Sequence, residues 1–145
     1  MSIREQITQA LEARLKTMTV ANGFTYDFSV HRANNTFDES DLPACSLWMG
    51  LEESDRVPGS TLQTVAIDID FHAEFKKETP DLTANKLIAD GRKALETHDV
   101  ALYALIQGLN YSGAEPEYPD DGVAVIAVRL AYTATYFTVR GDPAT

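Results

Sequence analysis

One segment of this chain constrains its fold more than any other. From Gln63 to Phe75, apolar and polar residues alternate, with only Ala66 out of pattern. A period of two over this length predicts a β-strand that buries one side and leaves the other side polar. The apolar side carries Val65, Ile67, Ile69, Phe71, Ala73 and Phe75, and the polar side carries Thr64, Asp68, Asp70, His72 and Glu74.

The polar side brings three carboxylates and one imidazole into a row. Asp68, Asp70, His72 and Glu74 stand at every second position, roughly 7 Å apart in an extended strand. The row predicts either a ligand site or a solvated, partner-facing surface. These residue types suit a cation such as Mg²⁺ or Mn²⁺. A straight row lets only two neighbours share one ion, however, so the surface interpretation is favoured over a metal site.

Composition indicates one domain with a substantial core. The chain has 145 residues, 44% of them hydrophobic, so we expect a single domain over residues 1–145. Its 22 acidic and 12 basic residues give a formal net charge of −10, which argues against a protein that grips DNA through the phosphates. The N-terminus has no apolar run behind a basic segment, and no stretch approaches the ~20 apolar residues of a membrane span. We therefore expect neither a signal peptide nor a membrane segment.

The rest of the pattern predicts two helices and further strands around the long strand. Ser2 caps a first helix whose apolar stripe reaches Met18, and Thr79-Pro80-Asp81 starts a second helix. We expect strands at 25–31, 44–52 and 123–139, with a weaker one at 109–118. This order predicts an α+β fold: a mainly antiparallel sheet of about four strands with both helices packed on one face. The other face should carry the acidic row together with Arg129, Thr133 and Thr135.

No short motif points to catalysis. The chain lacks a Walker loop and the patterns G-x-G-x-x-G, H-E-x-x-H, C-x-x-C and G-x-S-x-G. The single cysteine, Cys45, has no neighbouring His or basic cluster in sequence, which favours a buried apolar role over a nucleophilic one. We therefore expect no catalytic residues, no metal ligands and no cofactor.

Several parts of the chain resemble one known family. They are the amphipathic first helix, the strand S-L-W-M-G at Ser46–Gly50, the long acidic-faced strand, the Leu87–Leu95 helix, and the closing A-V-R-L-A-Y-T-A-T-Y at Ala127–Tyr136 followed by Asp142-Pro143. Together they resemble the tail terminator proteins (minor tail or tail-completion proteins) of long-tailed bacteriophages. The resemblance covers nearly the whole chain through its pattern and size.

The resemblance implies a structural role. Proteins of that family are not enzymes; they assemble as a ring, typically a hexamer, which caps the finished tail tube and meets the head connector. It implies a virion tail protein, assembled in the cytoplasm of a host bacterium, that contacts the tail-tube protein and no membrane. DNA passes through such a ring without specific binding. The row Asp68, Asp70, His72 and Glu74 is then a candidate lumen or interface face, because carboxylates repel a passing duplex.

Three other functions stay open on the sequence. A neck or head-completion protein, or a tail-tube subunit, shares the small size and the ring assembly. A metal-dependent enzyme built on the acidic row is a less favoured alternative. A bacterial homo-oligomeric domain of no phage origin is the third.

Overall fold

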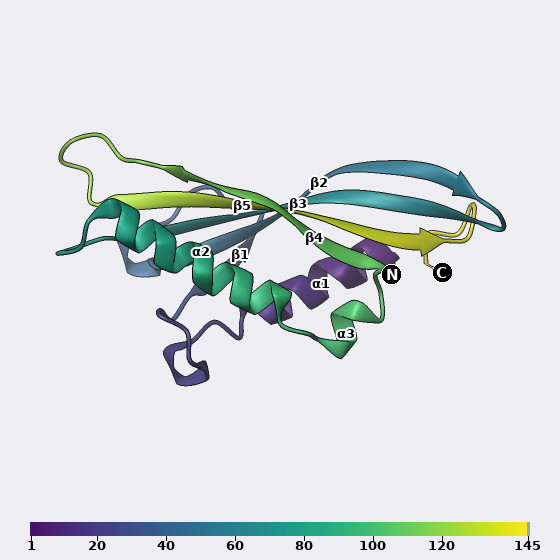
Figure 1. Cartoon of the computed structure of the whole chain (residues 1–145), viewed down its shortest axis with the longest axis horizontal. Helices are drawn as coiled ribbons and strands as arrows, with labels where there is room; N and C mark the ends of the chain where they lie inside the picture. The colour runs from purple at the N-terminus through teal and green to yellow at the C-terminus, as the bar shows by residue number, and fades with distance from the viewer. Residues whose placement is uncertain (145) are drawn as a thin grey trace.

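The computed structural model of the chain describes residues 1–144 and shows a five-stranded sheet with its helices on one face (Figure 1). The helices are α1 (Ile3–Leu15), α2 (Pro80–Glu96) and the short α3 (Val100–Tyr103). The strands are β1 (Ser29–Arg32), β2 (Ala44–Val57), β3 (Ser60–Glu74), β4 (Gly108–Glu117) and β5 (Val125–Thr138). Short 3-10 turns lie at Val20–Asn22 and Glu39–Asp41.

The strands are arranged in the order β1-β2-β3-β5-β4. The predicted α+β class and the placement of both long helices on one face are confirmed. The sheet has five strands rather than about four, and β1 pairs with β2 in parallel, whereas the other neighbours are antiparallel. The parallel pair arises because the segment between Arg32 and Ala44 leads the chain back to the level at which β1 begins, so Ala44 lies beside Ser29.

Local sequence signals explain where the two long helices begin. Ser2 Oγ accepts a hydrogen bond of 3.1 Å from the Glu5 backbone N–H, as the capping pattern predicts. The Glu5 carboxylate does not return to Ser2; it binds the Arg32 guanidinium of β1 at 2.7 Å and 3.1 Å. Pro80 occupies the first turn of α2, where its missing N–H costs nothing, and Asp81 follows near the positive end of the helix.

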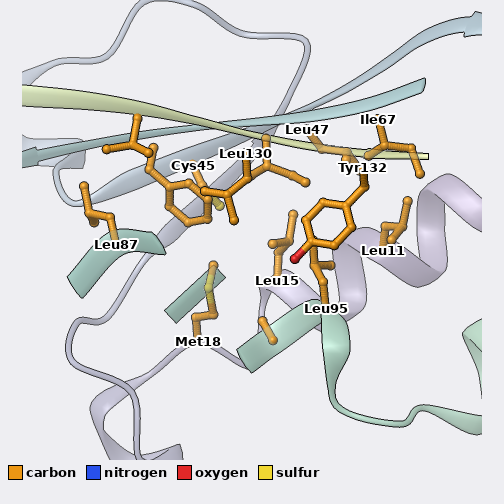
Figure 2. Packing of buried hydrophobic residues seen from close by; sticks show 14 of the residues in the cluster. Leu11, Leu15, Met18, Cys45, Leu47, Ile67, Leu87, Leu95, Leu130 and Tyr132 are labelled. Carbon is orange, nitrogen blue, oxygen red and sulfur yellow. The ribbon is translucent and has the colours of Figure 1, made fainter. Parts of the chain in front are cut away.

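The core lies between the sheet and the helices. β3 and β5 pair along their whole length, so Ile67 faces Tyr132 and Ile69 faces Leu130. Figure 2 shows Leu47, Ile67, Leu130 and Tyr132 pointing from the sheet toward side chains of the helices, all of them buried; the helix residues are Leu11, Leu15, Leu87 and Leu95. Cys45 lies in the same layer, and burial raises the pKa of its thiol, as expected of an apolar core residue.

Beyond the helices, the sheet continues as a projecting end. It consists of the hairpin of β2 and β3, closed at Pro58-Gly59, together with the last residues of β5 (Figure 1). Polar contacts replace the apolar layer here: Gln63 is hydrogen-bonded to Ser54 and, at 3.3 Å, to Thr138. The alternation of β3 therefore continues into the projecting end, but there the residues on its buried side are polar rather than apolar.

The two ends of the described chain meet beside the projecting end. The Ile3 N–H donates to the Pro143 carbonyl oxygen at 3.0 Å, which ties the start of α1 to the turn after β5. Figure 1 shows the N and C labels close together on that side of the molecule.

Candidate functional site: the open face of the sheet

The face of the sheet opposite the helices, here called the open face, carries the acidic row. Asp68, Asp70, His72 and Glu74 alternate with fully buried residues of β3, so the predicted placement of the row on that face is confirmed. The register of the neighbouring strands adds Ser46 and Trp48 from β2, Ala127 and Arg129 from β5, and Glu115 and Glu117 from β4.

The row is not a continuous strip of negative charge. Asp70 lies directly opposite Arg129, and its two carboxylate oxygens accept hydrogen bonds of 2.7 Å and 3.0 Å from the guanidinium. This bidentate contact raises the pKa of Arg129. The sequence placed both residues on one face, but their pairing depends on the register of β3 against β5, which the sequence did not predict.

His72 is covered by the loop that joins β1 to β2. The Phe37 ring lies 5.0 Å from the His72 ring and 5.0 Å from the His31 ring, measured between centroids. The loop is held against the sheet by a 2.9 Å hydrogen bond from the Asn34 N–H to Ser46 Oγ. Burial lowers the pKa of His72, opposed by the charges of Asp70 and Glu117. His72 is thus held as a neutral side chain rather than as a free member of a ligand row.

Asp68 and Glu74, toward the two ends of the row, take part in none of the ion pairs within residues 1–144. Asp68 lies between Trp48 on β2 and Ala131 on β5, and Glu74 lies beside Val125. These two carboxylates carry the negative charge of the row.

A hollow of about 460 Å³ opens on this face over β3, β5 and β4, and we call it the open-face hollow. It forms because Ala127, a small residue, lies between Glu117 and His72 on the neighbouring strands. Glu115 and Glu117 are exposed at its side. Sequence reasoning did not identify these two glutamates, although their alternation around Pro116 within an expected strand was a signal for them. The lining is Asp70, His72, Glu115, Pro116, Glu117, Ala127, Val128 and Arg129.

Elsewhere the described chain holds a second hollow and no gathered set of metal ligands. Within residues 1–144, no three His, Cys, Asp or Glu side chains are gathered so as to hold a metal ion. A second hollow, of about 740 Å³, lies beside the turn from β3 to α2 and is lined by both signs of charge, including Lys77 and Glu39. None of the described helices is long and apolar enough to cross a membrane.

Comparison of the sequence with models of known protein families finds no match, and comparison with curated proteins finds none either. The function is therefore inferred from the geometry of the open face. The open face offers two carboxylates on β3 and two on β4 that take part in no ion pair within residues 1–144, and they can repel an anionic polymer or bind a cationic group.

Proposed function

We propose that this chain is a structural protein of a phage tail, which caps the tail tube as a ring, ends its polymerisation and provides the surface that joins tail to head. The observation that carries the proposal is the two-sided sheet: one face is sealed by α1 and α2, while the open face is polar, acidic and uncovered by helices. The resemblance of Ser46–Gly50, Ala127–Tyr136 and the first helix to tail terminator proteins supports the same role.

A ring of identical subunits needs two different contact patches on each subunit. This chain offers surfaces of different character at the two ends of its sheet. The projecting end carries exposed apolar side chains, Phe137 and Val139, while the far end carries the acidic hollow. Such a subunit is suited to a closed, head-to-tail assembly.

The carboxylates of the open face suit a channel through which DNA must slide. Basic side chains would bind the phosphates and hold the duplex, whereas carboxylates repel it. We assign this part to Asp68 and Glu74, because Asp70 is neutralised by Arg129 and His72 is covered by Phe37. The row expected from the sequence thus becomes two half-buried, unpaired carboxylates around a neutral centre.

Electron microscopy of tail tubes incubated with the purified protein tests this function. The expected result is a single ring at one end of each tube, together with tubes that stop lengthening when the protein is added to polymerising tube subunits. Long stacks formed by the purified protein alone would instead support a tail-tube subunit. Saturable heat on titration with Mg²⁺ or Mn²⁺ would support the metal-enzyme alternative.

A further inference from the structure

Two groups of residues carry opposite charges that stay unpaired within residues 1–144: arginines at the projecting end, where Asp55 lies on the other face of β2 from Arg56, and glutamates at the hollow. No ion pair in this part of the chain includes Arg56, Arg140, Glu115 or Glu117. Arg56 is exposed near the tip of the β2–β3 hairpin, and Arg140 lies in the turn after β5. Glu115 and Glu117 line the open-face hollow.

These charges cannot meet within one molecule. Glu117 lies beside Ala127 near the start of β5, whereas Arg56 is opposite Thr61, which lies beside Thr138 at the end of β5. The distance along β5 from Ala127 to Thr138 is about 35 Å at the usual rise of a strand. An arginine side chain is far too short to span that distance, so each surface needs a second molecule.

We propose that the open-face hollow of one copy receives Arg56 of a second copy, so that copies join head to tail through the projecting end. The proposal is based on the ring function above and names the two patches that such a ring needs. Glu115 and Glu117 present two carboxylates to a guanidinium, which can form bidentate hydrogen bonds with a carboxylate. The neutral His72 and the paired Arg129 do not oppose the incoming charge.

Tyr118 is exposed next to Glu117, so an apolar side chain flanks the hollow. Phe137 lies beside Leu62 and therefore on the other face of the hairpin from Arg56, which lies opposite Thr61. Because the patches differ, the contact is heterologous and leads to a ring or a filament rather than a closed dimer.

Disulfide cross-linking of two variants, each with one added cysteine, tests the contact. Thr61→Cys, beside Arg56, and Ala127→Cys, beside Glu117, are each purified, mixed and oxidised, so that both charges of the contact are kept; Cys45 is buried and does not compete. We expect the mixture to give cross-linked dimer about tenfold or more above each variant alone. Lys77→Cys mixed with Ala127→Cys is the matched control, because Lys77 is exposed and unpaired but lies at the same end of the sheet as the hollow. A yield no higher than that control would overturn the proposal.

Charge reversal gives a second readout on the same surfaces. Arg56→Glu and Glu117→Lys should each weaken self-association about tenfold or more in sedimentation, and the double variant should recover it. A mixture of the two single variants should also recover association, because each contact then joins either the natural charge pair or the pair with exchanged charges. Rings on tube ends without the specific cross-link would refute this contact and leave the tail function standing. The specific cross-link without any binding to tube ends would support this contact and refute the tail function.

Discussion

At the scale of single residues, Gly91 shows how closely α2 packs on the sheet. A Cβ atom added at Gly91 would lie 2.8 Å from Phe71 Cζ and 3.1 Å from Leu130 Cδ2. Both of these side chains are fully buried and closely packed, so neither can move away without disturbing its neighbours. A residue with low helix propensity is therefore retained in the middle of a helix because of its size.

We expect Gly91→Ala to lower the free energy of unfolding by about 1–3 kcal/mol. The overpacking against Phe71 outweighs the gain in helix propensity, which is about 1 kcal/mol. Urea denaturation measures the difference. The control is Ala89→Gly, at an exposed position of the same helix, which should cost only the propensity difference of about 1 kcal/mol. A Gly91→Ala variant more stable than the natural chain would contradict the expectation.

His72 makes stability depend on pH in a defined direction. Because burial lowers its pKa below the ordinary value of 6.5, the folded chain binds this proton less readily than the unfolded chain. The contribution of His72 to stability is therefore full above about pH 6.5 and is lost as the pH falls toward the folded pKa.

We expect His72→Gln to flatten the decrease in the free energy of unfolding between about pH 7 and pH 5. Urea denaturation at a series of pH values measures the slope. His98→Gln, at an exposed site stacked on Tyr103, controls for the removal of an imidazole as such. Equal slopes in the natural chain and in His72→Gln would show that the covered imidazole does not titrate in this way.

At the scale of elements, β2 consists of two unlike halves. Ala44–Leu47 pairs on both sides, with β1 and with β3. After the irregularity between Met49 and Glu52, the strand pairs with β3 alone and its residues are mostly exposed. Local stability should follow this division, because opening the outer half exposes little apolar surface.

Hydrogen exchange followed by mass spectrometry should reveal the two halves. We expect peptides covering residues 53–62 to exchange before peptides covering 65–73, whose apolar side chains are buried under the helices. Peptides from the middle of β5, around Leu130, provide an internal reference for the core. Equal protection across all three regions would mean that the hairpin opens only when the whole chain unfolds.

Some features of the strands could be predicted from the sequence, and others could not. The alternation in β3 predicted both the strand and its sidedness, because a half-buried strand allows only one assignment of inner and outer residues. The parallel pairing of β1 with β2 could not be predicted from the sequence, because it depends on where the long loop between Arg32 and Ala44 brings the chain back to the sheet. The Asp70–Arg129 pair and the open-face hollow depend on register, and register in β4 is altered by an irregularity between Tyr111 and Gly113. Phe37 lies in a polar loop and gave no periodic signal.

At the scale of the whole molecule, the net charge of −10 determines how the chain meets a nucleic acid. Most basic side chains are occupied within the fold, for example Arg129 with Asp70 and Arg32 with Glu5. Few cations are therefore left to displace the counterions of a duplex, and the carboxylates of the open face add repulsion.

We expect no binding to duplex DNA at physiological salt. Fluorescence anisotropy of a labelled duplex should stay unchanged up to high protein concentration, and a dissociation constant tighter than about 10⁻⁴ M would contradict the expectation. A variant that carries both Asp68→Lys and Glu74→Lys serves as the positive comparison. It replaces the two unpaired charges of the row with cations and should gain measurable, salt-sensitive affinity.

The hydrogen bond between Ile3 and Pro143 holds the two ends of the described chain together, which allows the order of its segments to be changed. Because the two ends lie together, a short linker can join them, and the polypeptide can then be opened elsewhere without cutting a helix or strand. The exposed loop at Asp120–Gly122 is such a place, at the opposite end of the sheet. A circular permutant opened there would begin with β5, keep every strand neighbour, and move any fused tag from the projecting end to the far end.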